Sequence, residues 1–264
     1  MLRAFDAGRI YGHFQPGGGP LCVLLHGWER DSSDLAPLGS MLEERGLATL
    51  RLDLPGFGAS PAPESPWGTA EYAGAVRRVL VEVAGIPGEP GAVVVGHSFG
   101  GRVAIHLSAM VPPPVSAAVV TGVPLFRPQG GSTTPPFAYR VARWASRRGL
   151  ISQTRMEAVR RRYGSSDYQR ATGIMREIFV KVVNEDYGEQ LSAIRIPFEL
   201  VWGSADTAAP VDQARRAAAM VPGARLTVLD GQDHFGPVSR PAALASAVEA
   251  VIARLHSSER EEKG

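Results

Sequence analysis

Residues 92–110 contain the feature that most constrains how this chain can fold. The run Ala92 to Val95 predicts a short buried strand, and the apolar residues from Phe99 to Met110 recur at helical spacing. Between them lies the pentapeptide Gly-His-Ser-Phe-Gly, with Ser98 at its centre. A strand, a tight turn and a helix in this order are typical of the G-x-S-x-G nucleophile elbow, in which a strained turn exposes the serine hydroxyl. The sequence therefore predicts that Ser98 is a nucleophile.

The surroundings of Ser98 favour this interpretation. Gly96 and Gly100 carry no Cβ, so the strand and the helix can approach closely enough for a tight turn. The first N–H groups of a helix have no intrahelical acceptor, and the N–H of Phe99 is predicted to be one donor of an oxyanion hole. A bare G-x-S-x-G also occurs by chance in chains rich in glycine and serine. The strand before it and the helix after it make the functional interpretation the stronger one.

Composition limits the possible classes of protein. The 264 residues suffice for one α/β domain with a single large core. No apolar run approaches the roughly 18 residues that span a bilayer, and the N-terminus lacks a signal-peptide pattern, so we expect a cytoplasmic protein without membrane insertion. The only cysteine, Cys22, lies in an apolar run and is interpreted as a core residue. No C-x-x-C pair, H-E-x-x-H or P-loop is present, so we expect no metal, no cofactor and no nucleic-acid partner, only a small-molecule substrate.

Strands and helices alternate along most of the chain, and the strands are almost continuously apolar. This pattern predicts an α/β fold with a mostly parallel, doubly wound central sheet. The predicted strands are Leu2–Phe5, Arg9–Phe14, Leu21–Leu25, Leu47–Leu54, Ala92–Val95, Val115–Thr121, Ile196–Trp202 and Arg225–Leu229. The predicted helices are Asp34–Arg45, Thr69–Ala84, Phe99–Met110, Val211–Met220 and Pro241–Leu255.

The alternation is interrupted after Val123. Residues 124–195 contain no convincing apolar strand and are predicted to form a helical cap inserted between the core segments 1–123 and 196–256; residues 257–264 are predicted to be a disordered tail. The inserted segment has thirteen basic and six acidic residues, a net charge of +7, whereas the whole chain has +2. Its arginines either cover solvated helix faces or recognise an acidic substrate or partner, and the first is the commoner cause. An apolar stripe, Ile174, Ile178 and Val182, either lines a pocket or packs on the core.

Two later loops supply candidate partners for Ser98. Asp206 and His234 each follow a predicted strand, and the carboxyl ends of parallel strands meet at one crevice. His234 could then take the serine proton while Asp206 orients the imidazole. Three rivals are less suitable. His97 points away from Ser98 within the turn, His106 lies two helical turns further on, and Asp233 is too close in sequence to His234 to orient it.

The loop after the strand Leu21–Leu25 begins with His26, Gly27 and Trp28. A loop in this position is suited to the second oxyanion donor, which we predict to be the backbone N–H of Trp28. His26 itself is interpreted as a structural residue that fixes the loop. Asp53 precedes a tight turn and is interpreted as a residue that stabilises that turn.

Taken together, these segments resemble a capped α/β-hydrolase with a serine nucleophile. The resemblance covers almost the whole chain and implies a Ser98, Asp206 and His234 triad without a cofactor. Epoxide hydrolases and haloalkane dehalogenases of this fold use an aspartate nucleophile, so Ser98 argues against both. The segments that carry the resemblance are Leu25–Trp28, Asp53–Ser60, Gly96–Gly101, Trp202–Asp206 with Pro210, and Gly231–Phe235.

Two functions from different classes remain. The first is hydrolysis of an ester, thioester or other activated carbonyl compound, of carboxylesterase type; similar sequences also include carbon–carbon bond hydrolases and cofactor-free haloperoxidases. The second is a receptor-like protein that only binds a small molecule. The complete set of site residues favours hydrolysis. We expect a mainly apolar pocket with one or two cationic groups at its rim, so neutral esters should react at least as well as acidic ones. The oligomeric state stays open.

Overall fold

The computed structural model describes residues 2–84, 91–127, 144–146, 148, 150–152, 154–155 and 166–262. Within them the strands form one eight-stranded sheet in the order β1-β2-β4-β3-β5-β6-β7-β8. Strand β2 is antiparallel to β1 and β4, and all other neighbours are parallel, which confirms the predicted fold class. The strands are β1 (Leu2–Phe5), β2 (Ile10–Gln15), β3 (Leu21–Leu25), β4 (Ala48–Asp53), β5 (Val93–His97), β6 (Ala117–Thr121), β7 (Phe198–Gly203) and β8 (Arg225–Leu229).

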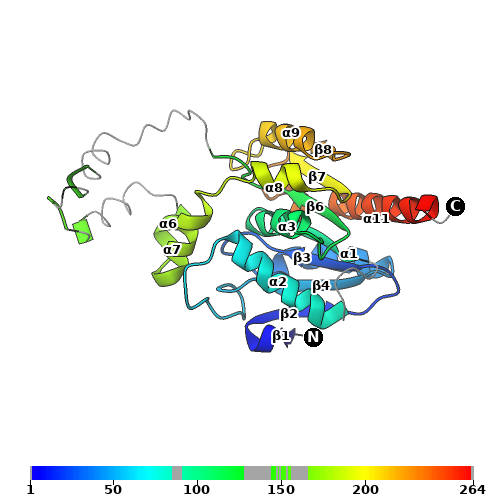
Figure 1. Cartoon of the computed structure of the whole chain (residues 1–264), viewed down its shortest axis with the longest axis horizontal. Coiled ribbons are helices and arrows are strands. Elements are labelled where there is room, and N and C mark those ends of the chain that lie inside the picture. Colours follow the sequence, from blue (N-terminus) through cyan, green and yellow to red (C-terminus); the bar gives the residue numbers. More distant parts are fainter. Residues whose placement is uncertain are drawn as a thin grey trace.

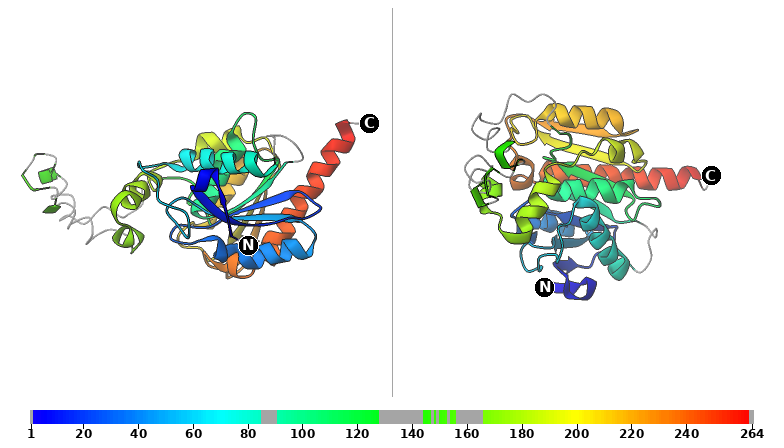
Figure 2. Two further views of the ribbon diagram at one scale, coloured as in Figure 1. Left: turned by 90° about the horizontal axis from the view of Figure 1, so that it is seen from below. Right: turned by 60° about the vertical axis from the view of Figure 1, so that its left-hand side comes forward.

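Helices cover both faces of this sheet (Figure 1 and Figure 2). One face packs against α2 (Thr69–Ala84), α3 (Phe99–Ala109), α8 (Gly188–Ala193) and α9 (Val211–Met220). The other packs against α1 (Ala36–Glu44), α10 (Gly236–Ser239) and α11 (Ala242–Glu262). Short 3-10 helices, η1 (Asp6–Gly8) and η2 (Ser32–Leu35), connect other elements. Strand β5 shows why its sequence is continuously apolar: Val94 is buried on one face, and Val93 and Val95 are buried on the other.

Two further helices lie beyond one end of the sheet, away from both helix layers (Figure 2). They are α6 (Ser166–Arg170) and α7 (Gly173–Val182), which follow the end of β6 in the chain and precede α8. Gly173, the first residue of α7, has φ of 50°, and α6 and α7 are separate helices. The predicted cap, residues 124–195, lies partly outside the described residues, which lack 128–143 and 156–165.

The boundaries of the predicted segments differ from the structure in two places. Helix α8 falls inside the predicted cap, yet it packs against α3 and α9, and Leu191 and Ile194 are completely buried in the main core. Helix α11 extends to Glu262, through most of the segment predicted to be a disordered tail. Glutamate and arginine favour helix, and adding residues to an existing helix requires no new nucleation. None of the helices in the described part of the chain has the length and apolar character needed to cross a bilayer.

Candidate active site

Ser98 occupies the turn between β5 and α3 in a backbone conformation that side chains rarely adopt. Its φ is 51° and its ψ is −108°. The turn is tight enough to require the flanking glycines: a Cβ on Gly100 would lie 2.2 Å from the carbonyl oxygen of Leu25, and one on Gly96 would lie 2.5 Å from that of Gly100. Strain of this kind persists only where the surrounding structure enforces it. The local geometry is therefore that of a nucleophile elbow.

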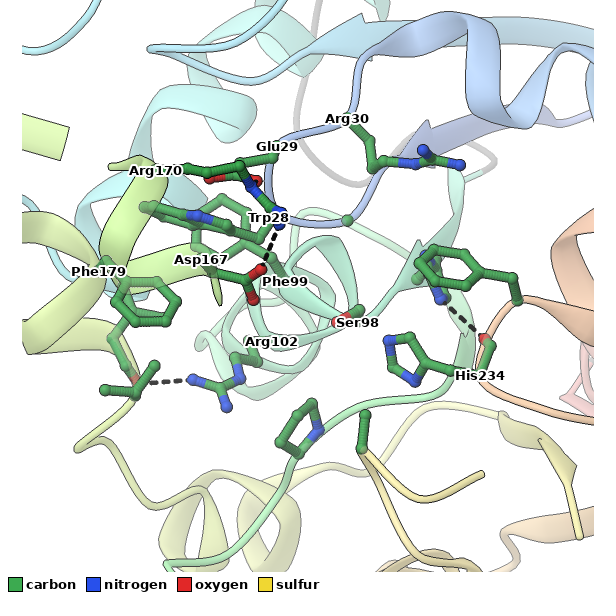
Figure 3. Close-up of a pocket in the computed structure, with 17 residues that line it drawn as sticks. Trp28, Glu29, Arg30, Ser98, Phe99, Arg102, Asp167, Arg170, Phe179 and His234 are labelled. Carbon is green, nitrogen blue, oxygen red and sulfur yellow. Dashed lines mark hydrogen bonds and ion pairs between the residues drawn. The ribbon is translucent and has the colours of Figure 1, made fainter. Parts of the chain in front are cut away.

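Ser98 opens into a cavity of about 760 Å³ (Figure 3). The cavity lies between the carboxyl ends of the parallel strands and the helices α6 and α7. Its walls come from distant parts of the sequence: Trp28 follows β3, Ser98 follows β5, Phe179 lies on α7, and His234 follows β8. Trp28, Ser98 and His234, which were predicted to follow separate strands, therefore line the same cavity.

His234 and Asp206 are joined by a hydrogen bond. The Nδ1 atom of His234 lies 2.8 Å from Oδ2 of Asp206. The other carboxylate oxygen of Asp206 accepts hydrogen bonds from the N–H groups of Ala208 (2.9 Å) and Ala209 (2.8 Å), and the Asp206 side chain is almost completely buried. Since Nδ1 is bound to the carboxylate, Nε2 is the nitrogen of His234 that remains for a partner in the cavity (Figure 3).

The rival residues have other contacts. Oδ1 of Asp233 accepts a hydrogen bond from the N–H of Phe235 at 3.1 Å, within its own turn. His97 is buried, and its Nε2 donates to the backbone oxygen of His234 at 3.1 Å. Burial lowers the pKa of His97 to about 3, so this ring is neutral. His106 packs edge-on against Tyr187, with ring centroids 5.7 Å apart.

The predicted oxyanion donors, the N–H groups of Trp28 and Phe99, belong to two residues that line the cavity together with Ser98. Phe99 is the first residue of α3, so its N–H has no intrahelical acceptor. The N–H of Gly100 donates to the carbonyl of His26 at 3.0 Å and so ties the loop that carries Trp28 to the turn. The rings of Trp28 and Phe99 pack edge to face at 5.4 Å. Their role as oxyanion donors stays a prediction.

The structural interpretation of His26 and Asp53 agrees with their contacts. Nε2 of His26 accepts the N–H of Leu54 at 2.9 Å, while Nδ1 lies 2.7 Å from the carbonyl of Gly27. Burial lowers the pKa of His26, which favours the neutral ring with a proton on Nδ1. Asp53 accepts N–H groups from two loops, those of Ser32 (2.7 Å) and Ala59 (2.9 Å).

The lining of the cavity decides between the two interpretations of the apolar stripe in the predicted cap. Ile174 and Ile178 pack on the main core, and of the stripe only Val182 also lines the cavity. Phe179 and Val183, which lie beside the stripe, line it as well. The stripe therefore packs α7 mainly against the hydrophobic core, and only one edge of the apolar face of α7 borders the cavity.

Arg102, which was not among the predicted site residues, lies in the cavity wall and is 7% exposed. Its Nη1 donates to the carbonyl of Val182 at 2.5 Å, and its guanidinium lies over the ring of Tyr187 at 5.6 Å. The expected cationic groups at the rim are also present, as Arg30 and Arg170. The signal that could have revealed Arg102 is its position in the first turn of the helix that follows the predicted nucleophile.

A mostly parallel sheet with a strained serine after β5 is the architecture of the α/β-hydrolase fold. A family model described as "Alpha/beta hydrolase family" matches residues 22–247, and the chain belongs to this family. It is 27% identical to the pimeloyl-[acyl-carrier protein] methyl ester esterase of Aromatoleum aromaticum, over 88% of this chain and 98% of that protein.

Solved structures agree on the fold. An esterase from Exiguobacterium antarcticum superposes with a TM-score of 0.69 at 18% identity, covering 96% of this chain and 98% of the other. An enol-lactonase from Burkholderia xenovorans gives a TM-score of 0.67 at 21% identity, covering 96% and 100%.

Proposed function

We propose that this member of the α/β hydrolase family is a serine hydrolase that cleaves an ester, thioester or similarly activated carbonyl compound through an acyl-enzyme. Ser98 is the nucleophile, His234 the general base and acid, and Asp206 the residue that orients the imidazole. The observation that carries the proposal is the 2.8 Å contact between Asp206 and His234 beside the strained turn at Ser98. These groups come from three different loops, and structural stability alone gives no reason for them to meet.

The geometry supports the following sequence of steps. Nε2 of His234 takes the proton of the Ser98 hydroxyl as the oxygen attacks the carbonyl carbon. Asp206 stabilises the imidazolium that forms, and the N–H groups of Trp28 and Phe99 donate to the negatively charged carbonyl oxygen. His234 then protonates the leaving group, and the acyl group stays on Ser98 until water, activated by the same histidine, releases it.

The similarity to an esterase in the chain's own family supports hydrolysis of a carboxylic ester as the reaction type. The cavity of about 760 Å³ is in the size range of small-molecule sites, which suits a small-molecule substrate. A receptor-like protein would require a pocket, but it would not require the hydrogen bond to Asp206 that leaves Nε2 of His234 free in a cavity that Ser98 also lines.

Labelling with a fluorophosphonate probe tests the proposal directly. We expect the wild-type protein to be labelled, the Ser98→Ala variant to be unlabelled and to hydrolyse esters at near background rates, and both proteins to melt at similar temperatures. Ser192→Ala, an exposed serine on α8, is the matched control and should be labelled like the wild type. Wild-type turnover in Ser98→Ala would contradict the assignment of the nucleophile. A wild-type protein that is neither labelled nor active would favour the receptor-like function.

A further inference from the structure

Arg102 combines burial, a position in the cavity wall and proximity to Ser98. It lies one helical turn after Ser98, and its N–H donates to the Ser98 carbonyl at 3.2 Å. Ser98 precedes α3 in a non-helical turn, and both Ser98 and Arg102 line the cavity. Figure 3 shows the Arg102 side chain extending from α3 toward α7, on the cavity side.

Among the described residues, Arg102 differs from the other charged residues of the cavity wall in having no anionic partner. Arg170 pairs with Glu29 (2.6 Å) and Asp167 (2.7 Å), and its side chain is 60% exposed. Arg30 pairs with Asp34 at 2.7 Å, and its side chain is 45% exposed. Both are rim residues.

Within the part of the chain that the structure describes, Arg102 makes no ion pair. Glu185 is an acidic residue that, like Arg102, contacts Tyr187. Its carboxylate accepts hydrogen bonds from other donors, the hydroxyl of Tyr187 at 2.6 Å and the N–H of Thr69 at 3.1 Å. The guanidinium of Arg102 contacts the carbonyl of Val182 and the face of the Tyr187 ring.

A guanidinium in this situation is suited to a ligand carboxylate. It carries five N–H donors, of which one contacts Val182. Burying a charge without a partner is unfavourable, whereas a carboxylate can accept two parallel N–H bonds from one guanidinium. The neighbouring walls, Phe179 and Val182, are apolar and would contact the methylene chain of a ligand that carries the carboxylate at its end.

The positions of His234 and Arg102 indicate which half of the substrate would carry this charge. The two residues lie on opposite sides of Ser98 in Figure 3. His234 must protonate the leaving group, so the leaving group lies on the His234 side and the acyl group extends toward Arg102.

We therefore infer that Arg102 binds a carboxylate at the far end of the acyl group, so that the preferred substrates are half-esters or half-thioesters of short dicarboxylic acids. This inference rests on the proposed function, because it takes Ser98 as the residue that is acylated. The inferred preference for acidic esters is the reverse of the sequence-based expectation that neutral esters react at least as well. That expectation was based only on charges at the rim and on the arginines of the cap.

The first test compares monomethyl glutarate with methyl pentanoate, two esters of equal chain length that differ in the terminal group. The measured quantity is the ratio of their kcat/KM values. We expect the wild type to favour the half-ester and Arg102→Gln to lower the ratio about tenfold or more, as is typical of a lost charge-assisted hydrogen bond. Arg102→Lys, which keeps a charge but cannot bind in a bidentate manner, should lower the ratio less. Arg215→Gln, on α9 and outside the cavity lining, is the matched control; its exposed side chain is paired with Asp212 at 2.7 Å, and its loss should change the ratio less than about threefold.

An unchanged ratio in Arg102→Gln would overturn the inference. So would an equal loss with both esters together with a lower melting temperature, because that result would make Arg102 only a link between α3 and α7.

A second test does not depend on turnover. Calorimetry should show that glutarate binds to Ser98→Ala and that binding is lost in Ser98→Ala combined with Arg102→Gln. Glutarate binding that depends on Arg102 would support the anion site even if another residue proved to be the nucleophile. Conversely, Ser98-dependent hydrolysis with no glutarate binding would leave the proposed function intact and reject the anion site.

Discussion

Two histidines, His26 and His234, lie in loops at the carboxyl ends of sheet strands, and they differ in the nitrogen atoms that remain free. Both nitrogens of His26 contact backbone groups, those of Leu54 and Gly27, and the residue is completely buried. His234 uses Nδ1 for Asp206, and its side chain is 17% exposed toward the cavity. A histidine whose two nitrogens are both engaged holds a loop, whereas one with a free nitrogen at a cavity can transfer a proton.

The nearby aspartates differ in the same way. Asp53 uses both carboxylate oxygens for backbone N–H groups, those of Ser32 and Ala59, and so joins two loops. Asp206 satisfies two N–H groups with a single oxygen and presents the other to His234. The two residues are equally buried, at 5% exposed, so burial does not distinguish them. The two aspartates differ instead in whether a carboxylate oxygen remains to accept a hydrogen bond from a histidine once the backbone N–H groups of the loop are bound.

The largest expected effect separates the two histidines. His234→Ala should lower kcat by about 10⁶-fold with little change in melting temperature, because triad residues act as a unit. His26→Ala should instead lower the free energy of unfolding by about 1–3 kcal/mol, since the N–H of Leu54 loses its buried acceptor. Ester hydrolysis and thermal unfolding of both variants measure the difference. Equal kinetic losses without destabilisation would remove the distinction.

The aspartates provide the second comparison. Asp206→Asn should reduce kcat by about 10⁴-fold, since the amide favours the wrong tautomer of His234. Asp53→Asn should reduce activity far less and should destabilise the fold by about 1–3 kcal/mol, because the amide NH₂ faces a backbone N–H. Kinetics and chemical denaturation of the two variants give the result. A larger kinetic loss in Asp53→Asn would reverse the assignment.

Acid should destabilise the protein through its buried histidines. The pKa of His97 in the folded protein is about 3, below its ordinary value of 6.5, so the unfolded chain binds more protons between these values. Stability is therefore complete above pH 6.5 and falls as the pH decreases, by about 2 kcal/mol between pH 6.5 and pH 5 from this residue.

His97→Gln can still donate to the backbone of His234 but does not titrate. The difference in its free energy of unfolding between pH 7.5 and pH 5, measured with urea, should be smaller than in the wild type. The same pH dependence in both proteins would show that His97 is not the cause.

The smallest effect is expected at the acid that lies next to His234 in the sequence. Asp233→Asn removes the negative charge but keeps an oxygen that can accept the N–H of Phe235, so kcat/KM should change less than about tenfold and stability by about 1 kcal/mol or less. Steady-state kinetics beside those of Asp206→Asn test whether proximity in space or in sequence identifies the acid. A loss as large as that of Asp206→Asn would show that Asp233 participates.

Most strands and core helices could be predicted because local rules and tertiary packing agree in them. The ranges of β3, α2, α9 and β8 coincide with the predictions. Predictions were less successful where tertiary contacts override the local pattern. Helix α8 joins the helix layer of the core because Leu191 and Ile194 find buried partners there, and its own six residues give no sign of that layer.

For the candidate site, the sequence by itself determined the residue types and their order. A serine between two necessary glycines, an acid after a strand and a histidine after the last strand follow from spacing, because the carboxyl ends of parallel strands share one edge. The glycines indicate a tight turn because only residues without a Cβ allow the strand and the helix to approach so closely.

Only the tertiary structure decided which contacts these residues make. Asp206, and not Asp233, contacts His234 because of the way the loops after β7 and β8 pack against each other. The packing is close: a Cβ on Gly203 would lie 2.2 Å from the carbonyl oxygen of Gln232. The role of Arg102 depends likewise on α7 closing over α3 and placing Val182 within reach of its guanidinium. Contacts between segments distant in the chain depend on packing and on the need to satisfy buried polar groups, and local sequence determines neither.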